Sequence, residues 1–157
     1  ALLKHKKVIV KNIKGNHDTM TSQVLSVAME FAFKNNPRVE ILPAEIPFMF
    51  HQFGKVMIAS THGDLVKPAK GPEVAANYAG KMWGETQYRY FLFGHFHHEH
   101  RQEIGGMTVE VFNTMASQDA WHYASGYKSQ QNLKGLTFDC DFGEVERCTF
   151  DVRRLMA

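Results

Sequence analysis

Residues 88–97 read YRYFLFGHFH, an aromatic and apolar run that ends directly in a glycine and two histidines. The first six of these residues have the composition of a β-strand. Residues 55–60 predict a second, apolar strand, and residues 61–64 (THGD) follow at its C-terminal end. Because ligands bind beyond the carboxyl ends of strands in open α/β sheets, we expect both polar stretches at a ligand-binding edge.

A third polar stretch follows a third predicted strand. Residues 7–13 (KVIVKNI) read as a buried strand, and residues 15–18 (GNHD) come soon after it. Residues 21–34 then have the apolar spacing of a helix, with Thr21 or Ser22 as the N-cap. Strand, polar loop and helix thus follow one another along the chain.

The rest of the chain predicts further strands and one more helix. Short strands are expected at residues 38–42, ended by Pro43, and at residues 48–53, and a helix at residues 72–83. Two hairpins follow, and they join residues 101–104 with 108–112 and residues 136–141 with 145–152. This order predicts an α/β fold with mixed sheets and a β-rich C-terminal tail, in a single domain of residues 1–157.

The composition is that of an ordinary globular domain. Of the 157 residues 44% are apolar and 22% charged, and the formal net charge of +2 is mild for a dedicated nucleic-acid-binding domain. No apolar run is long enough for a membrane span, and no signal-peptide core is visible, so we expect a cytoplasmic protein. Cys140 and Cys148 flank a predicted turn, across which they can face each other, but reduced packing thiols are the favoured interpretation.

The nine histidines gather mainly in and around these polar stretches, which indicates metal or catalytic chemistry. In their order, GNHD, THGD and GHFH resemble the later signature motifs of the calcineurin-like metallophosphoesterases, over about residues 8–112. The resemblance implies part of an αββα sandwich and a hydrolase with a dinuclear metal site. It implies phosphoester substrates, preferably phosphodiesters, among which nucleic acids and nucleotides are included.

The same resemblance assigns roles to individual residues. The implied metal ligands are Asn16, His62 and His95 for one metal and His97 for the other. By resemblance, His17 contacts the scissile phosphate or protonates the leaving oxygen, and Asp18 holds the His17 imidazole. An extended segment would project His95 and His97 to the same face. The two divalent metals are expected to be manganese, and iron, zinc or nickel also suit these ligands.

Two motifs of the family are absent from the 157 residues. The family's Asp-x-His and its Gly-Asp-x-x-Asp loop, which supplies a bridging aspartate, do not occur. We therefore expect a domain without its N-terminal βα units, in which metal affinity and hydrolysis are weak. We also expect an unpaired sheet edge and an exposed apolar face, covered by an N-terminal complement or by a second copy of the chain.

Simpler interpretations stand beside each motif. Residues 15–18 alone fit an Asx-type turn that leads into a helix, and His62 alone fits a strand-end histidine. His98 and His100 are expected to face solvent or to support ligands. Two other functions also remain open: a non-catalytic binding or scaffold module, and a mononuclear structural zinc site built from residues 95–100.

Overall fold

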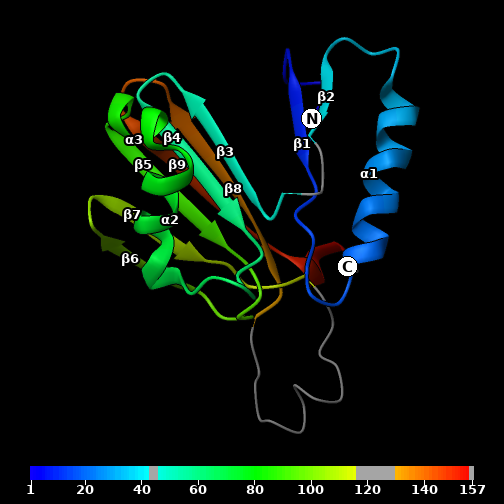
Figure 1. Cartoon of the computed structure of the whole chain (residues 1–157). Coiled ribbons are helices and arrows are strands. Elements are labelled where there is room, and N and C mark those ends of the chain that lie inside the picture. The colour runs from blue at the N-terminus through cyan, green and yellow to red at the C-terminus, as the bar shows by residue number, and fades with distance from the viewer. Residues whose placement is uncertain (43–45, 116–129, 156–157) are drawn as a thin grey trace, which may run out of the picture. The chain divides into compact units, whose positions relative to one another are not determined.

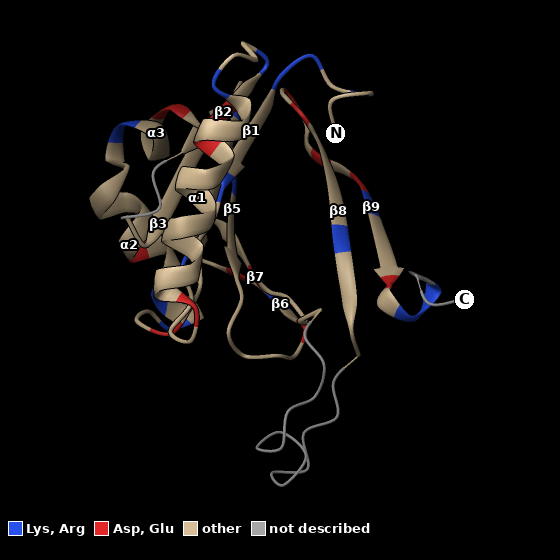
Figure 2. Ribbon diagram, turned by 90° about the vertical axis from the view of Figure 1, so that its right-hand side faces the viewer, with Lys and Arg blue, Asp and Glu red and all other residues tan. Residues whose placement is uncertain are grey.

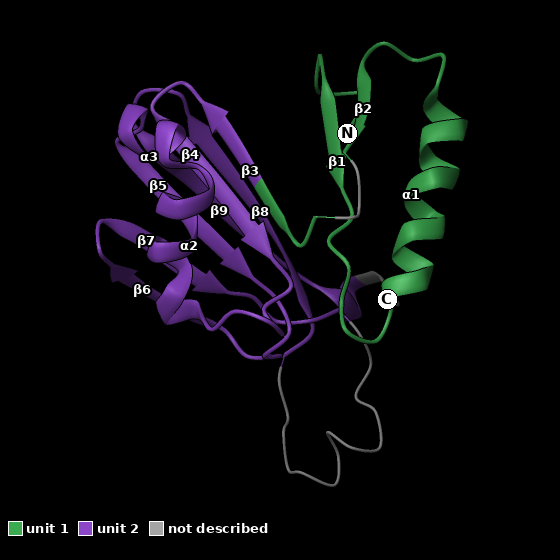
Figure 3. Ribbon diagram, viewed as in Figure 1, with its two compact units in different colours: residues 1–49 green, residues 50–157 purple. Residues whose placement is uncertain are grey.

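The computed structural model of the chain describes residues 1–42, 46–115 and 130–155. Over these residues it is a mixed α/β protein with three α-helices and nine strands (Figure 1). The chain forms two compact units, Ala1–Met49 and Phe50–Ala157, shown in Figure 3. Among the helices of the described residues, none combines the length and the apolar character that a membrane crossing requires.

The first unit is a parallel βαβ arrangement. Strand β1 (Val8–Lys11) pairs in parallel with β2 (Val39–Leu42), and helix α1 (Thr19–Phe33) connects them. Both predicted strands and the helix are confirmed, but β1 contains no buried residue, so the prediction that it is a buried strand is wrong. The predicted N-cap is also wrong. The helix begins at Thr19, and Ser22 lies inside it, where its N–H donates to the Asp18 carbonyl at 2.8 Å.

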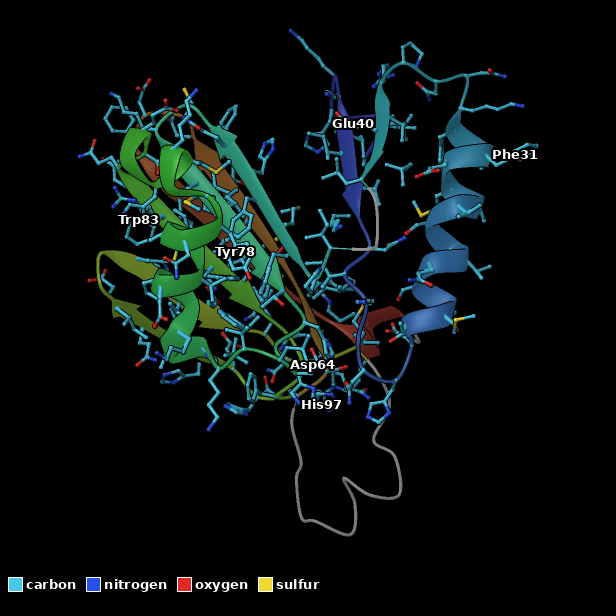
Figure 4. All side chains as sticks on the ribbon, viewed as in Figure 1. Phe31, Glu40, Asp64, Tyr78, Trp83 and His97 are labelled. Atoms are coloured by element: carbon cyan, nitrogen blue, oxygen red, sulfur yellow. The ribbon has the colours of Figure 1, made fainter. Side chains whose placement is uncertain are left out.

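Helix α1 buries small polar residues and exposes large apolar ones. Ser22 and Ser26 are buried, and Asn12 Nδ2 donates to Ser26 Oγ at 3.1 Å. The exposed large side chains of the helix are Met20, Val24, Leu25, Val27 and Phe31. Phe31 points away from the helix in Figure 4, and Figure 2 shows how little charge α1 carries. Large apolar side chains are therefore exposed on this helix.

The second unit is built on a five-stranded mixed sheet. In spatial order its strands are β3 (Phe48–Phe53), β4 (Val56–Thr61), β5 (Tyr88–Phe93), β7 (Met107–Val111) and β6 (His100–Ile104). Strands β4, β5 and β7 run parallel, and β6 is antiparallel to β7. The boundary between the units falls within β3. The predicted strands at residues 48–53 and 88–93 have the observed bounds.

Helices cover one face of this sheet. After a 3₁₀ turn (Pro68–Lys70) come α2 (Gly71–Tyr78) and α3 (Gly80–Glu85). A Cβ atom on Gly71 would lie 3.0 Å from the Phe91 ring, so α2 approaches the sheet closely at this glycine. The prediction of one helix over residues 72–83 is wrong. The chain leaves helical geometry at Ala79 (φ −133°, ψ 42°), directly before Gly80, a poor helix former.

A β-hairpin covers the opposite face. It consists of β8 (Asn132–Asp139) and β9 (Gly143–Asp151) and confirms the predicted β-rich tail. Tyr90 and Phe91 are successive residues of β5, so their side chains point to opposite faces of the sheet. The Tyr90 ring lies 4.8 Å from the Phe138 ring of the hairpin. The Tyr90 hydroxyl also accepts a hydrogen bond from the Glu144 N–H at 2.9 Å.

The two cysteines do not face each other. Cys148 lies opposite Gly135 in the hairpin register, whereas Cys140 belongs to the turn. Both thiols are free, as expected, but Cys148 is exposed, so it is not a packing thiol. The turn itself lies two residues earlier than predicted, and this shift changes which residues are opposite each other.

Ion pairs join the hairpin to the sheet. Glu110 of β7 is 1% exposed and accepts two hydrogen bonds from the Arg147 guanidinium. The hydrogen bond from Arg147 Nη2 to Glu110 Oε2 is 2.7 Å long. Arg147 Nε also donates to Glu144 at 2.8 Å. The two carboxylates raise the pKa of Arg147. The hairpin is therefore docked by charge-assisted hydrogen bonds as well as by aromatic contact.

Candidate metal centre

Two predicted ligand loops meet at the carboxyl ends of neighbouring parallel strands. His62 follows β4, and Gly94 and His95 follow β5; the last pair in the register is Thr61 with Phe93. The Gly94 N–H donates to the His62 carbonyl at 3.0 Å. The two loops are thus hydrogen-bonded to each other at the edge where the sequence predicts a ligand site.

The imidazoles of His62 and His95 point their ring nitrogens at each other. His95 Nδ1 lies 3.2 Å from His62 Nε2, and the ring planes are 70° apart. Two nitrogens that each lie about 2.1 Å from one metal are about 3.0 Å apart at a right angle and about 3.4 Å apart at a tetrahedral angle. The observed separation is that of an N–H···N hydrogen bond, and it also fits two ligands of a single metal ion.

The histidine loop after β5 has an unusual backbone. His95 and His97 both have positive φ, 67° and 54°, in the left-handed region that non-glycine residues rarely adopt. The expectation of an extended segment through these two histidines is wrong, because the strand ends at Phe93. Such conformations concentrate at functional sites, where the surrounding structure holds them in place.

Phe96 packs this loop against the one after β4. Its ring is 5.3 Å from the His95 ring, and a Cβ atom on Gly63 would lie 3.2 Å from it. Gly63 has φ +108°, which also disfavours a side chain. Gly63 thus permits both the turn after His62 and the approach of the Phe96 ring.

The structure brings together two of the four predicted ligands. His97 lies at the same edge of the second unit (Figure 4), but does not join His62 and His95 in a three-ligand group. Within residues 1–42, 46–115 and 130–155, only Asp139, Cys140 and Asp141 place three such ligand atoms within 4.8 Å of one another. The role of His97 as a ligand of a second metal stays a prediction.

The Asp139–Asp141 group is accounted for by the hairpin turn that contains it. Asp139 Oδ1 accepts hydrogen bonds from the N–H groups of Asp141 and Phe142, at 2.8 and 3.1 Å. The Asp141 carboxylate pairs with Lys55 at 2.9 Å, and hydrogen bonds from Lys55 and Cys140 lower the pKa of this carboxyl group. These contacts stabilise a turn and do not indicate a metal site.

The proposed mononuclear site in residues 95–100 gains no support. His98 and His100 are exposed, and His98 Nδ1 lies 2.9 Å from the Phe96 carbonyl. Among these described residues no three histidines converge on one point. The expectation that His98 and His100 face solvent is confirmed.

The GNHD residues lie in the first unit, and Asn16, His17 and Asp18 are all exposed. Asp18 Oδ1 accepts a hydrogen bond from the Gly15 N–H at 2.6 Å, and Thr19 Oγ1 donates to the Gly15 carbonyl at 2.9 Å. These contacts form a turn before α1, but Asp18 accepts from a residue that precedes it and no side chain caps the helix, so this is not the Asx-type turn of the simpler interpretation. The catalytic roles of His17 and Asp18 and the ligand role of Asn16 remain predictions.

Sequence reasoning missed two asparagines of the second unit. The Oδ1 atoms of Asn113 and Asn132 are buried and have no hydrogen-bond partner. Asn113 comes two residues after the end of β7, and a polar residue just past a predicted strand was the signal that could have identified it.

A separate cavity of about 410 Å³ lies at the other end of the strands. Its lining includes Gln87 and Tyr88 at the start of β5 and Gly105 and Gly106 in the β6–β7 turn. These residues are at the amino ends of β5 and β7, so this cavity is not part of the histidine site.

Comparison with known proteins does not extend this picture. No protein-family model, no curated protein and no solved structure matches the chain. The functional assignment therefore depends on the motifs and on the geometry at the strand ends.

Proposed function

We propose that the chain supplies metal ligands to a phosphoesterase of the calcineurin-like type, which hydrolyses phosphodiesters at a dinuclear metal centre. One observation carries the proposal: His62 Nε2 and His95 Nδ1 face each other at 3.2 Å beyond the carboxyl ends of adjacent parallel strands. The proposal includes the finer fold assignment, part of an αββα sandwich. A mixed sheet with helices on one face and a hairpin on the other supports that assignment.

The side chains present fit the proposed metals. Imidazole nitrogens suit manganese, iron, zinc and nickel, and His62 and His95 have the separation that one such ion requires. In the proposed arrangement, Asn16 adds an amide oxygen to this metal, and His97 binds the second. Bound metals would neutralise the phosphate oxygens and lower the pKa of water that attacks the phosphorus.

The remaining step concerns the leaving group. Expulsion of an alkoxide is easier when a positioned acid gives it a proton, and in our proposal the His17 imidazole does so. Asp18 would act through its position beside His17, holding the imidazole or its loop. Its hydrogen bond from the Gly15 N–H shows that the carboxylate already orders the backbone of this loop.

Metal binding by the chain tests the central observation. Titration with Co²⁺, followed by visible absorption, and with Zn²⁺, followed by calorimetry, is expected to show a site that His62→Ala and His95→Ala each abolish. His100→Ala is the matched control, because His100 is exposed on β6 and should leave the affinity unchanged. Equal affinity in wild type and in both site variants would remove the proposal.

Hydrolysis of bis-p-nitrophenyl phosphate with Mn²⁺ tests the catalytic part. We expect low activity from this chain alone, and more when an Asp-x-His and Gly-Asp-x-x-Asp segment of the same family is supplied. His17→Ala should then lower hydrolysis by about 10²-fold to 10⁴-fold with unchanged metal content, as the loss of a proton donor predicts. Equal hydrolysis by His17→Ala and wild type would exclude this role.

A non-catalytic binding or scaffold module is the second candidate. One observation favours it: no carboxylate of the described residues joins His62 and His95 in a three-ligand group. Metal binding that persists without hydrolysis, even with the added carboxylate segment, would favour this candidate over the enzyme.

A further inference from the structure

Three parallel strand ends lie side by side at the histidine edge. The Gly94 N–H donates to the His62 carbonyl at 3.0 Å, and the Phe112 N–H donates to the Phe93 carbonyl at 2.8 Å. The hydrogen bonds thus connect the end of β4 to that of β5, and the end of β5 to that of β7. His62 comes directly after β4, and His95 and Asn113 come two residues after β5 and β7.

Asn113 and His95 each follow the last register pair of two adjacent parallel strands. The last register pair of β5 and β7 is Phe93 with Val111. His95 comes two residues after Phe93, and Asn113 comes two residues after Val111. Asn113 Oδ1 is buried and has no hydrogen-bond partner. A buried acceptor without a donor is unfavourable, so such a group in a native protein calls for an explanation, such as a role in a site, an ion or an ordered water.

We propose that Asn113 is a positioning residue of the metal centre, whose Oδ1 accepts a hydrogen bond from His95 Nε2–H when a metal binds Nδ1. This inference depends on the proposed metal site. His95 Nδ1 faces His62, and when a metal binds Nδ1 the proton of the neutral ring is on Nε2. Ligand histidines usually donate their second N–H to an oxygen, which fixes the tautomer and the ring orientation.

Two substitutions separate the oxygen of Asn113 from its volume. Asn113→Leu keeps the approximate size and removes the acceptor, whereas Asn113→Asp keeps an acceptor oxygen. We expect Asn113→Leu to weaken Zn²⁺ and Co²⁺ binding about 10-fold to 100-fold, as loss of such a partner does elsewhere, and Asn113→Asp to restore it. The Tm of the metal-free Asn113→Leu variant should not fall, because no described hydrogen bond of Oδ1 is lost.

Asn132 provides the matched control. It is 5% exposed, and its Oδ1 is also buried without a partner, but it belongs to β8 of the hairpin. Asn132→Leu should leave metal affinity within about twofold of wild type. Nitrogen-15 shifts of the metal-bound His95 ring add a second readout. They should show a proton on Nε2 in wild type and an altered Nε2 environment in Asn113→Leu.

The outcomes distinguish the two levels of the argument. If wild type binds neither Zn²⁺ nor Co²⁺, the metal proposal fails and this inference fails with it. If wild type binds but Asn113→Leu binds equally well, only the role of Asn113 is overturned. Equal loss in Asn113→Leu and Asn132→Leu, or loss in both Asn113 variants with a lower metal-free Tm, would show a packing role and also overturn it.

Discussion

The two units of the chain differ in how they use their apolar residues. Every buried hydrophobic residue of the described chain lies in the second unit, from Val56 to Val111. In the first unit the buried residues of α1 are Ser22 and Ser26, while large apolar side chains of the helix are exposed. The His62 and His95 pair is thus built on a packed sheet, and the GNHD loop on a unit with little core of its own.

Strand ends fixed by a packed sheet can hold two imidazoles in a defined geometry, whereas a helix with an exposed apolar face gains little from folding alone. We therefore expect the second unit to dominate the free energy of unfolding. The following experiments test this difference, from the largest expected effect to the smallest.

Truncation of a core aromatic ring is the strongest test. Phe91 of β5 is fully buried and its ring lies against α2, so Phe91→Ala should lower the free energy of unfolding by about 3–5 kcal/mol. Phe31→Ala is the matched control in α1. Because Phe31 is 72% exposed, its loss should change the free energy of unfolding by less than about 0.5 kcal/mol. Urea unfolding measures both, and comparable losses would contradict the difference between the units.

Removal of a buried charge partner is the next test. Glu110→Ala leaves Arg147 with Glu144 alone, and we expect a loss of about 2 kcal/mol, less than for fully buried pairs because Arg147 is partly exposed. The double variant Glu110→Leu with Arg147→Met should recover most of this loss. A double variant as unstable as Glu110→Ala would mean that packing, not the unpaired charge, explains the effect.

A methyl group at Gly63 tests the loop that carries His62. The positive φ and the nearby Phe96 ring predict that Gly63→Ala loses about 1–3 kcal/mol of stability. It should also weaken Co²⁺ binding, because the His62 loop must shift. Gly84→Ala is the control: nothing lies near its Cβ position within α3, so it should gain about 0.5–1 kcal/mol. In thermal unfolding we expect the Tm to fall in Gly63→Ala and to rise in Gly84→Ala.

Acid should slightly lower the free energy of unfolding by weakening the ion pairs of Glu144. Burial would raise the pKa of Glu144, but hydrogen bonds and charges from Arg147 and Arg101 outweigh it and lower the pKa. A lowered folded pKa means that this contribution is full above the unfolded value, about 4.3, and is lost as pH falls through the folded pKa. We expect up to about 1 kcal/mol of loss. Glu144→Gln should remove that part of the pH dependence between pH 5 and pH 3.

Local patterns predicted most elements correctly. The strands at residues 48–53 and 88–93 have aromatic-rich sequences that are typical of a sheet, and the structure reproduces their bounds. The second helix was predicted as one piece because Gly71 and Gly84 look like helix ends in sequence. Gly71 is instead the first residue of α2, and the Phe91 ring, distant in sequence, lies where its side chain would be.

The histidine site shows the same limit. The motif order predicted that His62 and His95 belong together, but not that the loop after Phe93 leaves extended geometry at His95 and His97. That conformation arises from contacts with the neighbouring loop, through Phe96 and Gly63. Asn113 was missed because burial of an amide oxygen is a property of packing, which periodicity does not encode.

By itself the sequence determined the α/β class, the strands that end in polar motifs and the residue types suited to metals, because these follow from local composition and spacing. Tertiary structure alone decided that β4, β5 and β7 are neighbours, and hence that His62, His95 and Asn113 come from adjacent strand ends. Strand order depends on non-local hydrogen bonds and on burial of both sheet faces. It decided likewise that the apolar side chains of α1 face outward while those of β5 form a core.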